Sequence, residues 1–304
     1  MNHSFKGNFS ATHEKIAIIN SVLNIPLMLI SVAGNALVLA AILRYPSIRS
    51  TSMIMLCSLA VSDLLVGILA QPLFIADELT SLRSEDPMLH RITAMAGFFV
   101  CGVSLGTMTL ISVDRFMALH YHLRYSILVT KTRAMYVLGV IWLFSFLSFA
   151  IYFWNKLLHH LIAGILTAVC LIISTYSYIR IYRIVRQHQQ QIHVQQQAVE
   201  HSNIANNRHM MRVKKSAMNT FVFYIFMIIC YFPNVVILSL FGTAQQGWRA
   251  EWNFATTIVF LNSSINPVLH CWRLRELRTA IVRISKRILF KQTEENTMTT
   301  FSMG

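Results

Sequence analysis

Two carboxylic acids stand out because they lie in long apolar stretches of the sequence. Asp63 is in the middle of Leu59-Ala-Val-Ser-Asp63-Leu-Leu, and Asp114 precedes Arg115 at the end of another stretch. An ionisable side chain inside a bilayer is costly and is a functional hypothesis by default. Asp63 needs a cation, water, or amide and hydroxyl donors, whereas Asp114 could hold Arg115 until a partner competes for it. The alternatives are a neutral structural Asp63 and an ordinary interfacial pair. Candidate partners of Asp63 are Asn35, Ser104, Asn262, Ser263 and Asn266.

The elements that must position these acids are membrane-spanning helices. The chain has 304 residues, of which 55% are hydrophobic and 12% charged, whereas soluble domains carry about 25% charged residues. A helix needs roughly 20 mostly apolar residues to cross a bilayer. Seven stretches meet this requirement: about 16–43, 52–79, 87–119, 134–154, 158–182, 213–241 and 252–271. We therefore predict an all-α, seven-transmembrane helix bundle rather than a β-barrel.

The charges predict how the bundle is oriented. The N-terminal residues and the loops around 80–91, 155–160 and 242–251 hold equal numbers of basic and acidic residues, while the opposite side holds 20 of the 26 basic residues. Loops rich in Lys and Arg stay cytoplasmic, so we predict a plasma-membrane protein with its N-terminus outside. The net charge of +14 is then explained by topology and by attraction to anionic lipid, not by nucleic-acid binding. Glycosylation motifs at Asn2 and Asn8 agree with this orientation.

The chain is predicted to form one domain with two short terminal regions. These are an extracellular N-terminus over residues 1–15, a membrane domain over 16–272 and a cytoplasmic tail over 273–304. In the tail, apolar and basic residues alternate over Val282–Phe290, as in an amphipathic eighth helix lying on the inner membrane surface. A plain solvated tail is the alternative. The segment Gln187–Gln197 is expected to be a fraying helical extension or a flexible loop.

A short motif is present in most of the predicted spans. The motifs are Gly34-Asn35, Leu59-x-x-x-Asp63, Asp114-Arg115-Phe116, Trp142, Cys230-Tyr231-Phe232-Pro233 and Asn266-Pro267-Val-Leu-His270. Each is weak alone, but in this order they resemble the rhodopsin-like (class A) G-protein-coupled receptors over residues 16–290. His90 in place of the usual outer cysteine, and Cys170 in place of the helix-five proline, further resemble the melanocortin, adenosine, cannabinoid and lysophospholipid receptor group. The acidic pair that melanocortin receptors carry in outer helix three is missing.

The resemblance implies three sets of functional residues and no catalytic residue. An internal sodium and water site would consist of Asp63, with Asn35, Ser104, Asn262 and Asn266 around it, and Asp63 would be the sodium ligand. Coupling to a heterotrimeric G protein and switching would involve Asp114, Arg115, Phe116, Tyr178, Tyr231, Pro233, Pro267 and His270. An extracellular ligand would bind among Phe74, Asp77, Gly97, Phe98, Cys101, Asn234, Leu238, Trp252, Asn253 and Phe260. Pro233 would kink helix six, whose outward movement opens the cytoplasmic side to the G protein.

The pocket residues narrow the choice of ligand. Gly97 stands where amine receptors carry an aspartate, and Phe260 stands where opsins carry the retinal lysine, so an amine or retinal is disfavoured. An apolar pocket under an acidic rim could attract a basic peptide; the rim consists of Asp77, Glu78, Glu85 and Asp86. A plain solvated loop is the alternative for the rim, and a lipid is the alternative ligand.

Other classes of function remain open to different degrees. Phe116, Tyr231 and His270 depart from the family pattern, which permits a receptor-like decoy that no longer couples. A seven-helix ion transporter could use Asp63 and Asp114, but the usual repeat symmetry is missing. An enzyme is not expected, because the sequence has no phosphate-binding loop, catalytic acid pair or metal-ligand spacing. No acid lies near Val213 to hold Arg115 in the resting state, so we expect appreciable basal activity.

Overall fold

The computed structural model describes residues 2–45, 50–84, 86–121, 124–198, 204–241 and 249–286. Within these ranges, only the backbone is described for residues 2–13, 188–189, 192–198, 204–220 and 240–241. The described part of the chain is almost entirely helical and contains no strand. The side chains of Asn2 and Asn8 lie outside the described residues, so their glycosylation stays a prediction.

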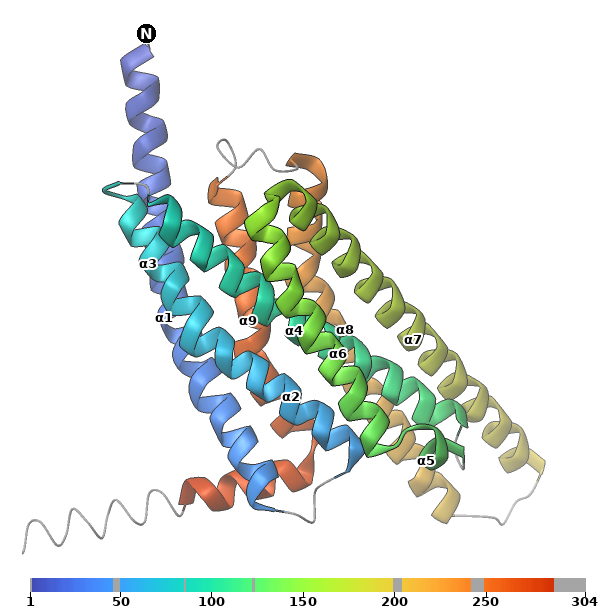
Figure 1. The fold of residues 1–304 in the computed structure, drawn as a ribbon. Helices are drawn as coiled ribbons and strands as arrows, with labels where there is room; N and C mark the ends of the chain where they lie inside the picture. The colour runs from blue at the N-terminus through green and yellow to red at the C-terminus, as the bar shows by residue number, and fades with distance from the viewer. Residues whose placement is uncertain are drawn as a thin grey trace, which may run out of the picture.

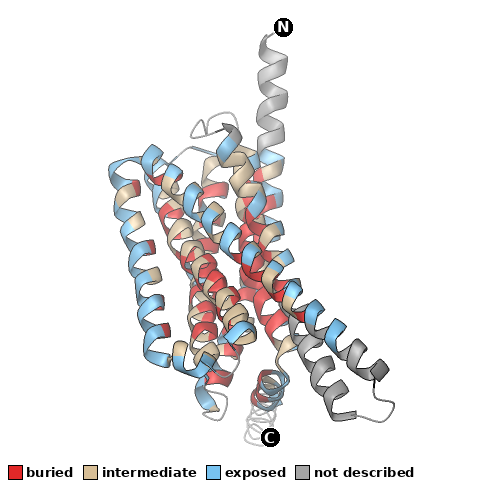
Figure 2. Ribbon diagram, turned by 90° about the vertical axis from the view of Figure 1, so that its right-hand side faces the viewer, coloured by how far each residue is buried: buried red, intermediate tan, exposed pale blue. Residues whose placement is uncertain are grey.

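Long helices lie side by side in one bundle (Figure 1). In chain order they are α1 (Asn2–Arg44), α2 (Thr51–Leu65), η2 (Val66–Ala70), α3 (Gln71–Ser81), α4 (Pro87–Tyr121), α5 (Tyr125–Leu128), α6 (Lys131–Trp154), α7 (Lys156–Ala198), α8 (Ile204–Phe241) and α9 (Arg249–Arg273). We call the end where α1 begins the upper end and the opposite end the lower end. Buried residues gather along the middle of the bundle, and the outward faces of its helices are exposed (Figure 2).

Six of the described helical stretches are long and apolar enough to cross a membrane by themselves. They are Glu14–Arg44, Thr51–Ser81, Pro87–Tyr121, Lys131–Trp154, Lys156–Gln187 and Phe221–Ser239. The seventh predicted span, α9, is more polar because Asn253, Asn262, Ser263 and Asn266 are buried along its inner face. It nevertheless packs against α1 and α8 within the bundle. The prediction of an all-α seven-helix bundle is confirmed.

The chain beyond α9 and the Gln-rich segment are also helical where they are described. Residues 275–286 form a helix that crosses the lower end of the bundle instead of continuing α9 (Figure 1). Residues 287–290 of the predicted amphipathic helix lie outside the described part. The segment Gln187–Gln197 continues α7 as a helical extension, which was one of its two expected forms. The division at residues 15 and 272 stays a prediction, and α1 already includes residues 2–15.

The second span changes its helix type just before Pro72. A proline has no N–H to donate to the carbonyl four residues earlier, and its ring crowds that carbonyl. Here that carbonyl belongs to Ile68, which lies in the π-helical turn Val66–Ala70. A wider turn accommodates the missing hydrogen bond and rotates the following residues about the helix axis. As a result α3 turns Phe74, Asp77 and Glu78 into the bundle.

A single residue, Asn155, joins α6 to α7. Its backbone N–H donates to Ile151 O at 2.8 Å and so ends α6. Its side-chain Oδ1 accepts from Leu158 N at 3.0 Å and so caps the start of α7. The outer loop expected around residues 155–160 is therefore reduced to one residue.

Gly34 of α1 packs directly against Pro267 of α9. A Cβ atom at this position would lie 2.8 Å from Cβ and from Cγ of Pro267. We therefore expect Gly34→Ala to lower the thermal stability of the purified protein, at an overpacking cost of about 1–3 kcal/mol. Gly139→Ala is the matched control, because a Cβ there meets nothing within 4 Å and alanine favours the helix by up to ~1 kcal/mol. Equal melting temperatures for the two variants would contradict the close packing.

Candidate functional site

Asp63 lies at the centre of a buried polar cluster that joins three helices. Its Oδ1 accepts hydrogen bonds from Ser104 Oγ of α4 and from Ser263 Oγ of α9, each at 2.8 Å. Its Oδ2 accepts from Asn266 Nδ2 of α9 at 2.7 Å. These donors replace the water that a buried carboxylate loses, so the cluster stabilises the packing of α2 against α4 and α9.

Asn35 and Asn262 border the cluster but do not hydrogen-bond the Asp63 carboxylate. Pro267 has no N–H for the carbonyl of Ser263 four residues earlier, and Asn35 Nδ2 donates to that carbonyl at 3.1 Å. Asn262 Nδ2 lies 3.3 Å from Met108 Sδ. Of the predicted sodium-site residues, Ser104 and Asn266 therefore hydrogen-bond the Asp63 carboxylate. Asn35 and Asn262 lie beside the cluster and contact other groups.

One further contributor was missed from the sequence. Ser31 Oγ donates to the backbone carbonyl of Asp63 at 2.8 Å, and Ser31 O accepts from Asn35 Nδ2 at 2.9 Å. Ser31 lies one helical turn before Asn35 and so on the same face of α1. That spacing could have identified it once Asn35 was singled out.

The donor set of the Asp63 cluster suits a monovalent hard cation. Ser104 and Ser263 each donate one proton to Asp63 and keep oxygen lone pairs, and Asn266 keeps its amide oxygen. Hard cations prefer such oxygen ligands. Within the described residues no group of three His, Cys, Asp or Glu side chains could hold a metal ion. Asp63 and Ser104 would hold sodium, and the ion would neutralise the buried carboxylate.

At the lower end, Asp114 is held by three partners at once. Ser52 Oγ donates to its Oδ2 at 2.9 Å, and Tyr125 OH donates to its Oδ1 at 2.6 Å. Arg115 Nη2 lies 3.4 Å from Oδ2. Burial and the hydrogen bond to Asp114 raise the pKa of Tyr125, so the phenol keeps its proton and remains a donor. Ser52 and Tyr125 therefore compete with Arg115 for the same carboxylate.

Arg115 has unused hydrogen-bonding capacity. Its Nε is buried and has no hydrogen-bond partner, while its side chain is 30% exposed. A buried N–H group without a partner costs free energy, so movement of the guanidinium toward a new acceptor is favoured. Beside it, Phe116 stacks on His120 with 5.3 Å between ring centroids.

Two predicted switch residues, Tyr178 and His270, have separate surroundings. Ser112 Oγ donates to Tyr178 OH at 3.1 Å, and the Tyr178 ring lies 4.5 Å from that of Tyr224. His270 instead packs on Phe223 at 4.8 Å between centroids, and its buried Nε2 has no hydrogen-bond partner. Among the described residues, no hydrogen bond joins Tyr178 to His270.

Two further predicted switch residues lie along α8. Tyr231 is buried, and its OH donates to Cys101 O of α4 at 3.3 Å. Pro233 lies inside α8, where it cannot donate to the carbonyl of Ile229. The upper half of α8 is thus fixed to α4 next to a point where its own hydrogen-bond ladder is weakest.

The upper half of the bundle encloses a cavity of about 350 Å³, within the usual range for small-molecule sites. We call it the ligand cavity. Tyr231 and Val259 line it together with all ten predicted pocket residues: Phe74, Asp77, Gly97, Phe98, Cys101, Asn234, Leu238, Trp252, Asn253 and Phe260. Its wall is mainly apolar and aromatic, and the rings of Phe74 and Phe260 meet edge to face at 5.5 Å. A Cβ at Gly97 would meet nothing within 4 Å, so this glycine widens the cavity.

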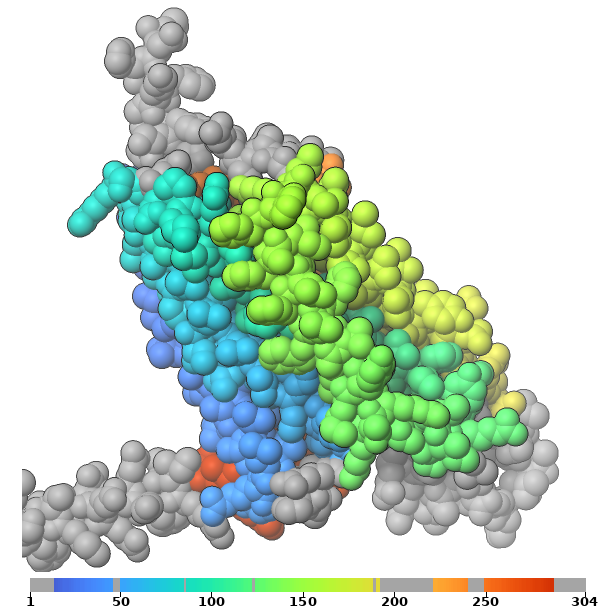
Figure 3. All heavy atoms as spheres, viewed as in Figure 1, coloured from blue at the N-terminus to red at the C-terminus, as the bar shows by residue number. Residues whose placement is uncertain are grey.

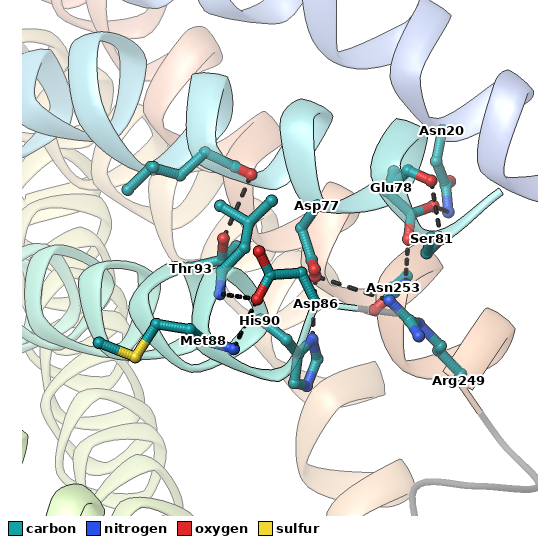
Figure 4. Close-up of polar contacts among 12 residues, drawn as sticks. Asn20, Asp77, Glu78, Ser81, Asp86, Met88, His90, Thr93, Arg249 and Asn253 are labelled. Carbon is teal, nitrogen blue, oxygen red and sulfur yellow. Dashed lines mark hydrogen bonds and ion pairs between the residues drawn. The ribbon is translucent and has the colours of Figure 1, made fainter. Parts of the chain in front are cut away.

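The rim acids are largely engaged inside the protein (Figure 4). Asp77 Oδ2 lies 2.9 Å from His90 Nδ1 and 3.8 Å from Arg249 Nη2. Glu78 accepts from Asn20 Nδ2 at 3.5 Å and from Asn253 Nδ2.

These contacts correct the expected role of the rim. Asp77 and Glu78 are buried and join α3 to α1, α4 and α9. Asp86 is exposed, but its Oδ1 accepts from Met88 N and Leu89 N and so caps α4. Glu85 lies outside the described residues. The described rim therefore offers little free negative charge to a basic ligand, because the π-turn in the second span turns two of its acids inward.

Comparison with known proteins finds similarity to one class of membrane receptor. The family model described as "7 transmembrane receptor (rhodopsin family)" matches residues 34–156. The chain is 28% identical to the histamine H2 receptor of Canis lupus familiaris, over 86% of this chain and 77% of that receptor. It is 26% identical to melanocortin receptor 3 of Mus musculus, over 84% of this chain and 82% of that receptor. It is 27% identical to cannabinoid receptor type 1B of Takifugu rubripes, over 86% and 62% of the two chains.

These matches agree with the motifs and the helix bundle. They support the identification of the chain as a class A, rhodopsin-like receptor. The chain is a multi-pass membrane protein, and the proteins that it resembles are signalling receptors, not enzymes.

Proposed function

We propose that this receptor binds an extracellular ligand in the ligand cavity and responds by activating a heterotrimeric G protein at its lower end. The observation that carries the proposal is the course of α4. It contributes Gly97 and Cys101 to the cavity, Ser104 to the Asp63 cluster and Arg115 to the lower end. A ligand that shifts the upper part of α4 would therefore act on both polar sites along one helix.

The movement we propose is an outward displacement of the lower half of α8. Tyr231 joins α8 to Cys101 of α4 through a hydrogen bond. Pro233, two residues later, removes one backbone hydrogen bond from the same turn of α8. Kinked helices can pivot at such points. Opening the lower end would give Arg115 access to the G protein and would provide an acceptor for its unpartnered Nε.

The proposed orientation places the upper end outside the cell and the lower end in the cytoplasm. The N-terminus is then extracellular, and the basic loops face the anionic inner leaflet of the plasma membrane. A sodium ion at Asp63 belongs to the same proposal, because the surrounding oxygens suit it. Release of that ion would accompany rearrangement of α4 and α9.

The comparisons do not indicate one class of ligand, because the similar relatives are named for three different ligands: histamine, melanocortin and cannabinoid. Gly97 leaves no acid in the middle of the cavity wall, and Asp77, the acid on its described wall, is already paired with His90. This favours a peptide or lipid-like ligand over an amine. The apolar wall favours the lipid.

A non-coupling receptor-like decoy is the second candidate. The observation that favours it is His270, which packs on Phe223 and makes no hydrogen bond to Tyr178. A decoy would keep the ligand cavity and lose only the response at the lower end.

Direct recruitment of G protein tests the proposed function. Wild-type receptor, Arg115→Ala and the control Arg44→Ala would be expressed at matched surface levels; Arg44 is also an arginine at the lower end but is exposed on α1. We expect basal recruitment and a shift of cyclic AMP that disappear in Arg115→Ala and persist in Arg44→Ala. Absence of recruitment of every G-protein class by the wild type would support the decoy instead.

A further inference from the structure

A line of buried polar contacts runs between α1 and α9 from the upper end of the bundle to the Asp63 cluster, and we call it the polar seam. At successive points along it, a group of α1 is hydrogen-bonded to α9, either directly or through Glu78 of α3. From the upper end downward, the contacts are Asn20–Glu78–Asn253, Asn24–Thr257, Leu27–Ser264 and Asn35–Ser263. Ser263 also donates to Asp63, so the polar seam ends at the proposed sodium site.

The ligand cavity, in contrast, is separated from Asp63 by apolar side chains. Each helical segment that contributes to the Asp63 cluster has an apolar residue one turn above its polar residue. These are Val66, Val100 and Phe260, which are 0%, 0% and 1% exposed and pack together. A cation loses hydration without compensation among such side chains. Direct passage of an ion from the ligand cavity to Asp63 is therefore unfavourable.

The upper part of the polar seam holds buried oxygen atoms that lack a hydrogen-bond partner among the described residues. They are Asn20 Oδ1, Ser21 Oγ and Gln71 Oε1, and these residues are 0%, 4% and 0% exposed. Ser21 lies three residues before Asn24 and so on the same face of α1. Native proteins rarely bury such atoms unpaired. A cation, together with water that it carries, would supply the missing partners.

The neighbouring hydrogen bonds identify these unpaired atoms as oxygens. Asn24 Nδ2 donates to Asn20 O at 2.8 Å and to Thr257 Oγ1 at 2.9 Å. Asn24 Oδ1 therefore accepts from Gln71 Nε2, at 3.4 Å, and the amide oxygen of Gln71 is left over. Asn20 Nδ2 lies 3.5 Å from the Glu78 carboxylate, which leaves Asn20 Oδ1 over. Exchanging nitrogen and oxygen in either amide would place two acceptors against each other.

Glu78 provides the negative charge that attracts a cation to the upper part of the polar seam. Glu78 is 2% exposed, and its carboxylate accepts from the neutral amides of Asn20 and Asn253 (Figure 4). The adjacent Asp77 faces Arg249, with 3.8 Å between Oδ2 and Nη2. A guanidinium in this neighbourhood repels a cation. Glu78 is therefore suited to brief occupancy by an ion, and not to tight binding.

The polar seam is accessible at its upper end. Asn253, which donates to Glu78, also lines a hollow of about 590 Å³ at that end of the bundle. On the face seen in Figure 3, α2 and α3 lie in front of α1 and their side chains form a closed surface. An ion would therefore enter from above, beside Glu78, and not through this side of the bundle.

We propose that sodium reaches Asp63 along the polar seam, and that Glu78 with Asn20, Ser21 and Gln71 forms a weak transit site for the ion. This inference rests on the sodium site of the proposed function and adds a second site for the same ion. The ion passes between α1 and α9, where oxygen atoms are available along the way. Asp63 remains the site of stable binding.

The rate of sodium exchange tests the route, because a residue on the route changes the rates of binding and release without changing the affinity. Purified receptor in nanodiscs of neutral phosphatidylcholine would be studied by sodium-23 NMR line broadening, with Asp63→Asn as the blank. Titration of the melting temperature with sodium gives the Kd. We expect Glu78→Gln to slow exchange at least fivefold and to keep the Kd within threefold of the wild type.

Three further variants distinguish the polar seam from other routes. Ser264→Ala removes an oxygen from the middle of the seam without changing a charge and is expected to slow exchange as well. Glu251→Gln is the matched control, because Glu251 is an exposed acid at the upper end of α9, and it should leave the rate unchanged. Gly97→Leu fills an open part of the ligand cavity and should also leave the rate unchanged. The melting temperature without sodium checks that each variant is folded.

Two results would overturn the route. One is an unchanged exchange rate in both Glu78→Gln and Ser264→Ala, and the other is slower exchange in Gly97→Leu alone, which would place the route in the ligand cavity. A Kd weakened at least fivefold by Glu78→Gln would show that Glu78 supports the Asp63 site itself and would overturn the transit site. Absence of any sodium signal from the wild type would overturn the sodium site and the route together, while G-protein recruitment would still test the rest of the proposed function.

Discussion

Sodium chloride is expected to raise the melting temperature of the purified receptor above that in choline chloride at equal ionic strength, and Asp63→Asn is expected to remove the difference. A ligand that binds only the folded state stabilises it by RT ln(1 + [L]/Kd), or about 1.4 kcal/mol when sodium exceeds its Kd tenfold. The carboxylate supplies the negative charge that offsets the cost of burying the ion. The asparagine side chain has nearly the same shape but no charge.

The control for this experiment keeps the carboxylate and changes a neighbour. Asn262 Nδ2 contacts Met108 Sδ and not Asp63, so Asn262→Ala is expected to keep most of the sodium effect. Ser104→Ala removes a donor to Asp63 and is expected to weaken the effect. A melting temperature that responds equally to sodium and choline would show that the cluster holds Asp63 through protein donors and water alone.

The sequence predicted hydrogen bonds between helices well where a buried polar residue had few possible partners. Asp63 in an apolar span needs donors from other helices, and Ser104 and Asn266 were among few candidates. The walls of the ligand cavity were predicted from the resemblance to the receptor family, which implies the face of each helix that points inward. The ten predicted pocket residues all line one space.

The sequence was less informative where a local change in helix geometry decides which way a side chain points. The π-turn before Pro72 turns Asp77 and Glu78 inward, and a reading based on a regular α-helix leaves them on an acidic rim. Asn35 illustrates the same limit. Pro267 leaves the carbonyl of Ser263 without its backbone donor, and Asn35 donates to that carbonyl instead of to Asp63. Such choices depend on distances between helices that spacing along the chain does not contain.

The charge available at the upper end could not be predicted for a related reason. The loops there hold equal numbers of basic and acidic residues. Pairing of Asp77 with His90 and Arg249, and capping of α4 by Asp86, change which charges remain available. The net charge of a loop region therefore does not give the charge of the space that it borders.

Asp114→Asn is expected to raise basal G-protein activation, because it weakens the hold on Arg115. The pair is 3.4 Å apart and Arg115 is 30% exposed, so its loss is worth about 1 kcal/mol after allowance for solvent screening. A change of this size shifts a two-state equilibrium about fivefold. Nucleotide exchange by G protein in membranes with matched receptor levels measures the effect.

Tyr125→Phe should change basal activation in the opposite direction. Tyr125 OH donates to Asp114 Oδ1 at 2.6 Å and so competes with Arg115 for the carboxylate. Without the Tyr125 hydroxyl, the ion pair between Asp114 and Arg115 becomes stronger. Basal activation is therefore expected to fall. Adding Arg115→Ala to Asp114→Asn should silence the receptor, since the group that we propose contacts the G protein is then missing. An increase in both Asp114→Asn and Tyr125→Phe would show that Asp114 joins α2, α4 and α5 as a structural element and does not restrain Arg115.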